Sequence, residues 1–371
     1  MHRAGPVIRR LVIVLLVASI PAWSAADGAE TDALVFLQKL EELRTEKHIP
    51  GLSVAIVRDG AVYLAAGLGY ADIEAGTPAT AETPFNIASV TKPISAVAAL
   101  RLVEAGKLDL DRPIAEYSEW QDFCARFSEQ PSIFARDLSC EPATHTLRHL
   151  FSHTATGEAG TYYSYNPVLF SWASRPIMAV TGTSFSSFVQ AEVLDLAGMR
   201  HSARKYRDLP LPPDLAARQA PTYRIDAAGN AERAPLPPPQ GDGAAGGVVS
   251  TVLDLARFDI ALDQGELISA ESRSAMMAPT PLANGETAPY GLGWFVKDYN
   301  GQTLVWHTGW WEDAYSALYL KVPELGLSFI LLANSEGLWW GNPLDQATIE
   351  RSVFAVAFLE SFVDGGSDPA E

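Results

Sequence analysis

The spacing of hydrophobic residues changes along the chain, and each spacing predicts a different kind of element. Leucines recur at helical spacing from Leu34 to Leu43, between a Thr-Asp start and a Pro-Gly stop, which predicts a helix. The next stretch, LSVAIVRDGAVYLAAGLGY, has two β-rich runs on either side of Asp59-Gly60, a dipeptide that tolerates the positive φ angles of a tight hairpin. We therefore expect two antiparallel strands directly after the first helix.

Short apolar or alternating runs return near the C-terminus. Turn residues at Asn300-Gly301, Pro323-Glu324 and Gly326 separate the runs YGLGWFVKD, QTLVWHTG, SALYLKVP and LSFILLANS. This pattern predicts three or four more strands. The last segment, DQATIERSVFAVAFLESFV, has the apolar periodicity of a closing helix.

The part between these ends reads as helix or loop. Within it, LPLPPD and APLPPPQGDG are too rich in proline for regular structure. The whole pattern predicts an α/β (α+β) fold in which residues 30–95 and 246–363 build one antiparallel sheet flanked by helices. Residues 96–245 then form a mostly helical subdomain inserted between the two halves of the sheet. Residues 364–371 are expected to be a disordered tail.

The first 25 residues have the organisation of a secretory signal peptide. Arg3, Arg9 and Arg10 precede an apolar run from Leu11 to Ile20, and small residues follow. The run is short for a membrane span, although an uncleaved N-terminal anchor stays an alternative. Because no cysteine lies near the expected cleavage site, the pattern does not favour a lipoprotein. We expect a periplasmic or secreted protein.

The charge of the chain excludes some classes of partner. The formal net charge is -17 at pH 7, and removal of residues 1–25 takes away three arginines and no acidic residue. A chain this acidic repels nucleic acid and anionic lipid surfaces. We expect no nucleic-acid partner and no membrane contact beyond the export signal.

The two cysteines, Cys124 and Cys140, lie in one polar segment that also contains aromatic residues. An exported protein meets an oxidising compartment, which favours a disulfide that closes this segment. Two unpaired cysteines in a core are the alternative.

The stretch FNIASVTKPISA contains a serine three residues before a lysine, Ser89 and Lys92. The sequence continues as a helix that Gly106 ends, and Pro93 falls in its first turn, where a missing N–H costs least. Residues three apart share a helix face, so the lysine can reach the serine hydroxyl and take its proton. An ordinary N-cap serine beside a solvated lysine is the alternative.

A second pair with this spacing occurs at Ser202 and Lys205 in SARK. Prolines follow closely in YRDLPLPPD, so no helix is expected to hold the two side chains on a common face. We interpret this pair as a chance match.

Three motifs together give the sequence a family resemblance. Ser89-Val90-Thr91-Lys92, the tyrosine-rich YYSYNP and His307-Thr308-Gly309 occur in the order found in the serine β-lactamase and penicillin-binding-protein superfamily, and the chain most resembles its class C, D-aminopeptidase and family VIII esterase branch. The likeness runs from about residue 33 to 360 and includes LVEAGKLDLDRPIAEY, LRHLFSHTATG, AAGGVVSTVLDLARF, YGLGW and LLANS. It implies a β-lactamase/transpeptidase-like domain over residues 30–363, with a cleft between the sheet and the helical subdomain.

The resemblance implies that Ser89 attacks a carbonyl and becomes acylated while Lys92 takes or relays its proton. The second motif normally supplies a tyrosine that acts as a base with the lysine and later protonates the leaving group. Aligning YYSYNPVLF with this motif favours Tyr165, with Tyr163 as the alternative. Pro167 then stands where the family has an asparagine, which puts the substrate-orienting role of Asn166 in doubt.

The third motif implies a strand that lines the cleft. By the family's geometry the oxyanion hole consists of the backbone N–H groups of Ser89 and Trp310. The resemblance implies substrate binding by Asn166, Thr308, Gly309 and Trp311. The two tryptophans, Trp310 and Trp311, form an aromatic wall beside the oxyanion hole or, equally, fill a gap in the core.

His307 stands where β-lactamases and transpeptidases usually have a lysine. A histidine is mostly neutral at pH 7, and this exchange is common in the esterase and D-peptidase relatives. The resemblance therefore implies a serine hydrolase, without metal or other cofactor, that acts on a small ester or D-amino-acid amide. A cephalosporin-hydrolysing β-lactamase and a penicillin-binding-like module that is acylated without turnover are the alternatives. The expected partner is a small ester, amide or lactam, and the expected state is a monomer.

Two further motifs allow other functions. His145, His149 and His153 recur every four residues and would lie on one face of a helix, as in some zinc sites. They have no acidic ligand nearby, so we expect them to cap or hydrogen-bond within the helical part, with His153 near the cleft entrance. GDGAAGG lacks the lysine of a phosphate loop and is interpreted as a loop before a helix capped by Ser250 or Thr251.

Overall fold

The computed structural model describes residues 26–364 except 142, 342–343 and 345. The predicted signal peptide and residues 365–371 of the predicted tail lie outside the described residues. The helices are α1 (Ala26–Glu46), α2 (Thr91–Glu104), α3 (Trp120–Ser128), α4 (Leu147–Phe151), α5 (Pro167–Trp172), α6 (Ser174–Thr181), α7 (Phe185–Val189), α8 (Pro213–Arg218), α9 (Val252–Asp263), α10 (Ala270–Met276) and α11 (Val353–Phe362). The strands are β1 (Gly51–Arg58), β2 (Ala61–Asp72), β3 (Thr77–Pro78), β4 (Phe85–Asn86), β5 (Ala203–Arg204), β6 (Thr222–Ile225), β7 (Ala231–Ala234), β8 (Val248–Ser250), β9 (Phe295–Tyr299), β10 (Gln302–Trp310), β11 (Ser316–Val322) and β12 (Leu327–Ala333).

A seven-stranded antiparallel sheet, in the order β3-β2-β1-β12-β11-β10-β9, forms the centre of the fold. The first strands and the last strands of the chain join where β1 pairs with β12. Asp59 and Gly60 turn the β1–β2 hairpin with φ angles of 51° and 73°, as their sequence predicts. The expected sheet from both ends of the chain is confirmed, with four strands in its C-terminal part.

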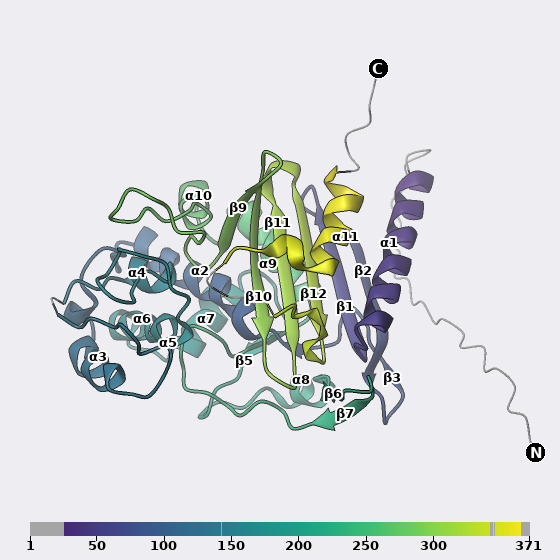
Figure 1. The fold of residues 1–371 in the computed structure, drawn as a ribbon, viewed down its shortest axis with the longest axis horizontal. Coiled ribbons are helices and arrows are strands. Elements are labelled where there is room, and N and C mark those ends of the chain that lie inside the picture. Colours follow the sequence, from purple (N-terminus) through teal and green to yellow (C-terminus); the bar gives the residue numbers. More distant parts are fainter. Residues whose placement is uncertain (1–25, 142, 342–343, 345, 365–371) are drawn as a thin grey trace, which may run out of the picture.

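Helices cover both faces of this sheet (Figure 1). Helices α1 and α11 pack on one face, where Phe36 contacts Phe329 and Phe362 at ring-centroid distances of 5.6 and 5.0 Å. Helices α2 and α9 pack on the other face. Successive residues of a strand point to opposite faces, so Leu331 joins the first core and Ile330 the second. Burial on both faces explains why the β12 sequence is apolar almost throughout.

The helical part lies to one side of the sheet and contains α3 to α7 (Figure 1). The stretch predicted to be helix or loop also contains strands. Strands β6 and β7 form a two-stranded hairpin, and β5 pairs with β8 beside β4. The prediction missed the hairpin because β7, Ala231–Ala234, has the composition AERA, in which no residue favours a strand.

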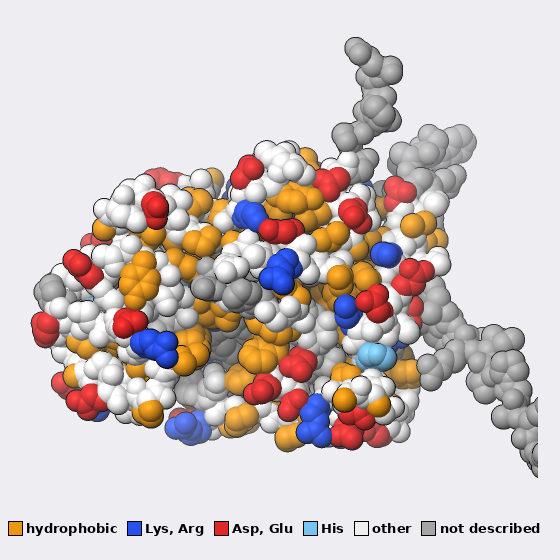
Figure 2. All heavy atoms as spheres, viewed as in Figure 1, with side chains coloured by type: hydrophobic (Ala, Val, Ile, Leu, Met, Phe, Trp, Pro, Cys, Tyr) orange, Lys and Arg blue, Asp and Glu red, His pale blue; other side chains and the backbone are white. Residues whose placement is uncertain are grey.

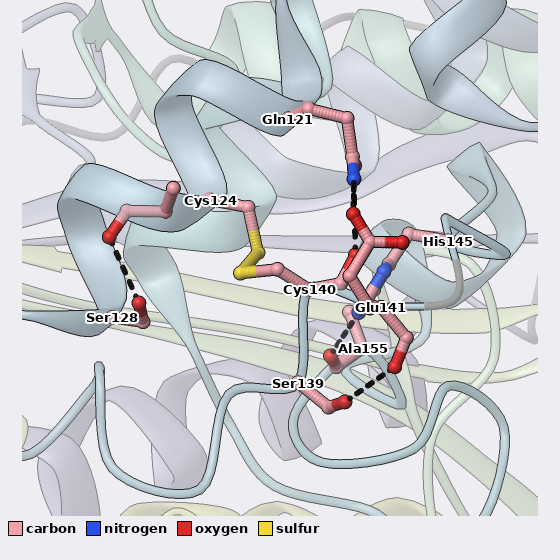
Figure 3. The surroundings of a disulfide bond; sticks show 9 residues. Gln121, Cys124, Ser128, Ser139, Cys140, Glu141, His145 and Ala155 are labelled. Carbon is pink, nitrogen blue, oxygen red and sulfur yellow. Dashed lines mark hydrogen bonds between the residues drawn. A yellow bond between two sulfur atoms is a disulfide. The ribbon is translucent and has the colours of Figure 1, made fainter.

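The two cysteines form a disulfide, which confirms the predicted pairing. Figure 3 shows that it joins α3, through Cys124, to the segment at Cys140. Beside it, the Gln121 side-chain amide donates to the Cys140 carbonyl at 3.1 Å and to Glu141 Oε1 at 2.7 Å. The segment between the cysteines is therefore tied to α3 at its far end.

Candidate active site

Ser89 lies in a 3-10 turn, Ala88–Val90, that leads directly into α2. The turn is held against the small β4-β8-β5 sheet, since the Ile87 N–H donates to the Val248 carbonyl at 3.1 Å. Ala88, the residue before the serine, has a left-handed φ of 47°, which costs energy for a residue with a side chain. The surrounding contacts hold this strained turn and so fix the position of the serine, which is partly exposed.

The Lys92 amine lies beside the serine hydroxyl, as the sequence predicts. Its Nζ is 2.7 Å from Ser89 Oγ and 3.2 Å from the carbonyl oxygen of Ala245. The side chain is fully buried, and Nζ lies 5.1 and 5.3 Å from the ring centroids of Tyr165 and Phe170. No carboxylate of the described residues forms an ion pair with it. Burial therefore lowers the pKa of Lys92 well below its usual value, so the amine can accept a proton.

Strand β10 extends beyond its edge neighbour at the site. Strand β9 pairs with β10 only as far as Trp306, whereas β11 pairs with it as far as Trp310. The Trp311 N–H donates to the Tyr315 carbonyl on the β11 side at 2.9 Å. Neighbouring residues of a strand direct their backbone groups to opposite sides, so the Trp310 N–H points toward the edge that β9 leaves uncovered. This is the orientation that the predicted oxyanion-hole donor requires.

Gly309 permits β10 to approach the serine turn. A Cβ atom on this glycine would lie only 2.2 Å from the carbonyl oxygen of Ile87. No side chain fits at this distance, so glycine is required for the strand and the turn to be adjacent. The predicted contact of Gly309 with substrate stays a prediction.

Tyr165, rather than Tyr163, lies beside the nucleophile. Its hydroxyl is near enough to Ser89 to affect its own pKa, and its ring centroid lies 5.1 Å from Lys92 Nζ. The Tyr163 hydroxyl instead donates to the carbonyl of Leu344 at 2.8 Å. Burial raises the pKa of Tyr165 above its usual value, although the nearby Ser89 hydroxyl acts in the opposite direction. The phenol is therefore protonated at neutral pH.

Both ends of the Asn166 amide bond to the protein itself. Its Oδ1 accepts from the Leu169 N–H at 3.1 Å and caps α5, and its Nδ2 donates to the Phe134 carbonyl at 2.7 Å. The side chain is 2% exposed. Pro167, which replaces the family's asparagine, is the first residue of α5, a position that suits proline. Substrate binding by Asn166 stays a prediction and would require these bonds to break.

His307 is fully buried on β10, and both of its ring nitrogens have partners. Nδ1 lies 2.7 Å from the Thr308 carbonyl oxygen, and Nε2 lies 2.7 Å from the Tyr290 hydroxyl. Burial lowers the pKa of His307 well below its usual value, and Lys92 lowers it further. The imidazole is therefore neutral at neutral pH.

The histidine triplet does not lie on one helix, because α4 contains only Leu147–Phe151. The expected capping role is confirmed for His149, whose Nδ1 accepts the Thr146 N–H at 3.1 Å in a capping box. His145 Nε2 donates to the Ala155 carbonyl at 2.9 Å. Within the described residues no group of three histidine, cysteine or acidic side chains is placed to hold a metal ion.

His153 lies deeper than the expected position near the cleft entrance. It is 1% exposed, and its ring centroid lies 4.2 Å from that of Tyr165. Its Nδ1 accepts the Asn166 N–H at 3.0 Å. The backbone φ of His153 is 56°, a second strained position beside the site.

The two tryptophans after Gly309 have different environments. Trp310 is 39% exposed, stacks on Trp339 at 5.3 Å and donates its Nε1–H to Glu336 Oε2 at 3.0 Å. This position suits the predicted aromatic wall. Trp311 packs against the core that contains α2, which suits the alternative. The buried Thr308 Oγ1 has no hydrogen-bond partner within the described residues.

Reasoning from the sequence missed Tyr290 and the Ala245 carbonyl as parts of this site, and it placed His153 too near the cleft entrance. Tyr290 belongs to YGLGW, one of the segments that carry the family resemblance. Its place in that segment was the available signal, but only the fold brings it to His307.

The Ser202–Lys205 pair is extended rather than helical, and Ser202 Oγ donates to Asp254 Oδ2 at 2.7 Å, so its interpretation as a chance match fits. Thr251 caps α9, as expected.

The surface is mixed where the two parts of the molecule meet. Figure 2 shows hydrophobic side chains gathered between the helical part and the sheet, with charged side chains scattered around them. Along residues 26–364, gaps excepted, no helix combines the length and the apolar character needed to cross a bilayer.

Comparison with known proteins adds a family to this geometry. The family model described as Beta-lactamase matches residues 36–349. Penicillin-binding protein 4* of Bacillus subtilis is 25% identical over 349 residues, which cover 81% of this chain and 71% of that protein. Esterase EstB of Burkholderia gladioli is 37% identical over 132 residues, which cover 36% of this chain and only 29% of the esterase. The solved D-amino acid amidase from Ochrobactrum anthropi SV3, complexed with L-phenylalanine amide, shares the fold with a TM-score of 0.68 at 21% identity, covering 90% of this chain and 99% of that one.

Proposed function

Because this chain belongs to the beta-lactamase family, which confirms the resemblance seen in its motifs, we propose that it is a serine hydrolase that works through an acyl-enzyme on Ser89. The observation that carries this proposal is the buried Lys92 amine, 2.7 Å from Ser89 Oγ and without a carboxylate partner among the described residues. Burial favours the neutral form of such an amine, and it is adjacent to the proton it must remove.

Acylation begins when Ser89 Oγ attacks the carbonyl carbon of the substrate and its proton passes to Lys92 Nζ. The raised pKa of Tyr165 keeps this phenol protonated, so it is not available as the base and holds a proton for a strongly basic leaving group; we assign the base role to Lys92. Tyr165, beside Ser89, passes a proton to the leaving alkoxide or amine and regains it from Lys92. The proton taken from the serine thus leaves with the alcohol or amine, and the lysine is neutral again.

The negative charge that develops on the carbonyl oxygen needs donors that are already in place. The Ser89 N–H at the start of the helical turn and the Trp310 N–H on the uncovered edge of β10 are the proposed pair. Gly309 supports this assignment, because only a glycine lets the two backbones approach each other. Deacylation reverses the sequence with water as the nucleophile, and Lys92, acting through Tyr165, removes the proton from water.

The proposed substrates are small esters or D-amino-acid amides. EstB is named as an esterase and the structural neighbour as a D-amino acid amidase, and both names fit this chemistry. The neutral His307 in place of a lysine further supports substrates that need no cation.

Hydrolysis of p-nitrophenyl butyrate by the mature protein tests the proposal. Ser89→Ala should abolish release of p-nitrophenol, and a fluorophosphonate should add to the wild type but not to this variant in intact-mass spectra. Ser202→Ala, which alters the serine of the other Ser-x-x-Lys pair, is the matched control and should keep full activity. An adduct on Ser89→Ala would contradict the assignment of the nucleophile.

The same samples decide between the alternatives. Turnover of nitrocefin at a rate comparable with the ester would make the protein a β-lactamase. The similarity to penicillin-binding protein 4* favours the other alternative, in which a β-lactam forms a lasting adduct on Ser89 without turnover of any substrate. Ester turnover without either result supports the esterase or amidase assignment.

We also propose that the protein is exported to the periplasm or secreted and acts as a monomer. The Cys124–Cys140 disulfide supports an oxidising compartment. Cell fractionation and light scattering of the mature protein test these two points.

A further inference from the structure

The hydrogen bonds around His307 define the position of its proton. The Thr308 carbonyl oxygen can only accept, so the Nδ1 atom 2.7 Å away carries the hydrogen. In a neutral imidazole the other nitrogen is then an acceptor, and Nε2 accepts from the Tyr290 hydroxyl at 2.7 Å. The two bonds are complementary and together specify one tautomer.

Tyr290 is well placed to enforce this state. Its ring is fully buried and packs edge-on against His307, with 5.9 Å between the ring centroids. A protonated Nε2 would itself have to donate to the tyrosine oxygen, and the hydroxyl hydrogen would then need another acceptor. The structure gives the Tyr290 hydroxyl no second partner among the described residues.

The groups that face His307 offer no negative charge to stabilise a cation. Lys92 of α2 is a base, and Tyr165 and Tyr290 are phenols with raised pKa values. His153 packs on Tyr165 and its pKa is lowered by burial. Phe295 of β9 closes the remaining side, 5.6 Å away between ring centroids. Next along β10, Thr308 offers an uncharged hydroxyl without a hydrogen-bond partner among these residues.

We propose that Tyr290 is a positioning residue that holds His307 as the neutral Nδ1–H imidazole, so that β10 presents no cation and the site selects acyl donors without a carboxylate. This inference deepens the proposed function and rests on it for its substrate class. The state of His307 does not depend on any activity and can be measured alone.

Nitrogen-15 NMR of the histidine side chains tests the first half of the proposal. The spectrum of His307→Gln identifies the His307 signals by their absence. We expect the neutral Nδ1–H pattern throughout pH 6 to 8 in the wild type. In Tyr290→Phe, the hydroxyl that donates to Nε2 is lost, so the pKa of His307 should rise. A wild-type His307 that is protonated at pH 7, or that carries its hydrogen on Nε2, overturns the proposal.

A matched pair of esters tests the second half. p-Nitrophenyl butyrate and mono-p-nitrophenyl succinate have similar chains, and only the succinate carries a carboxylate. The wild type should prefer the butyrate in kcat/KM, and Tyr290→Phe should reduce that preference as the pH falls to 6, while leaving it unchanged at pH 8, because a higher pKa of His307 restores the cation only on the acidic side. His307→Lys should reduce the preference at both pH values.

Tyr315→Phe is the matched control, since it also removes a buried hydroxyl. The Tyr315 hydroxyl donates to the Ala220 carbonyl at 2.5 Å and does not contact His307. It should leave the preference unchanged. A wild type that prefers the succinate, or a preference that neither Tyr290→Phe nor His307→Lys changes, overturns the proposal. If the wild type cleaves neither ester while NMR shows the Nδ1–H form, the proposed function fails and the assignment of the tautomer is supported.

Discussion

Two lysines are buried to the same degree in this protein, and their surroundings give them opposite properties. Lys92 and Lys321 are 0% and 1% exposed. Lys92 contacts a hydroxyl and a carbonyl oxygen, and burial lowers its pKa. Lys321 on β11 bonds to Asp259 and, at 3.0 Å, to Asp263, both on α9. Burial acts on Lys321 as well, but the two carboxylates outweigh it and raise its pKa.

Burial alone does not decide the charge of a lysine. A carboxylate within hydrogen-bond distance favours the ammonium form even in the core, and without one burial favours the neutral amine. Lys321 therefore joins α9 to the sheet as an ion pair, and Lys92 is free to act as a base.

Loss of the catalytic amine should have the largest effect. Lys92→Met should lower the rate of acylation by roughly 10²–10⁴-fold, because a positioned base contributes about this much. Its stability should not fall. At pH 7 the unfolded chain holds a proton on Lys92, whereas burial disfavours this charged form in the folded chain, so this lysine costs stability. Burst kinetics and thermal unfolding measure the two effects, and a variant that unfolds at a lower temperature contradicts the comparison.

Loss of the structural amine should have the reverse pattern. Lys321→Met leaves Asp259 buried without a cation, with only the Tyr319 and Ser328 hydroxyls of the described residues bonded to it, and should lower the free energy of unfolding by about 3–5 kcal/mol. Acylation by the folded fraction should change little. Denaturant unfolding measures the loss, and the double variant Lys321→Met/Asp259→Leu, which replaces both charges by apolar groups, should recover most of it. No recovery would mean that the ion pair is not the cause.

The pH dependence of acylation sharpens the comparison further. Protonated Lys92 cannot accept the serine proton, so the rate should fall about tenfold per pH unit below the pKa of this amine. Because that pKa is lowered by burial, the rate should already be on its plateau well below pH 10. Stopped-flow acylation at a series of pH values measures this. A rate that reaches its plateau only near the usual pKa of a lysine would show that Lys92, like Lys321, stays charged in the folded protein.

The smallest expected effect concerns His149, a partly buried histidine whose pKa is also lowered by burial, and its influence on stability at low pH. Burial lowers the pKa of His149 to about 4, and nearby His145 contributes. The unfolded histidine binds a proton below about pH 6.5, so this contribution to stability is complete above that pH and is lost as the pH falls to about 4.

His149→Gln keeps a side chain that suits the capping box and removes the titration. It should reduce the loss of stability between pH 7 and 5 by on the order of 1 kcal/mol. Thermal unfolding at both pH values provides the test, and an unchanged loss would show that His149 is charged in the folded protein.

Local patterns in the sequence were enough to predict much of this fold. The Asp59-Gly60 turn, the C-terminal strands and the helix after Ser89 each depend on neighbours within a few residues. The proximity of Ser89 and Lys92 followed from their helical spacing. The family resemblance then indicated that the strand with His307-Thr308-Gly309 lines the same site. These features are local, so the chain encodes them where they occur.

The contacts that set the chemistry are not local. Tyr290 meets His307 from 17 residues away, and Lys321 meets Asp259 across 62 residues. Spacing in the sequence carries no information on such pairs, because only the packing of β10 and β11 against their neighbours brings them together. The bond from the Asn166 amide to the Phe134 carbonyl, across 32 residues, escaped prediction for the same reason.

Strand β9 ends at the level of Trp306, which leaves the rest of the β10 edge without a neighbouring strand among the described residues. An exposed row of backbone donors and acceptors on a sheet edge invites a foreign strand and, through it, aggregation. Here the open row is only a few residues long, and its side chains His307 and Thr308 are buried. An edge this short offers a foreign strand few backbone hydrogen bonds, so the gap beside Ser89 adds little risk of such pairing.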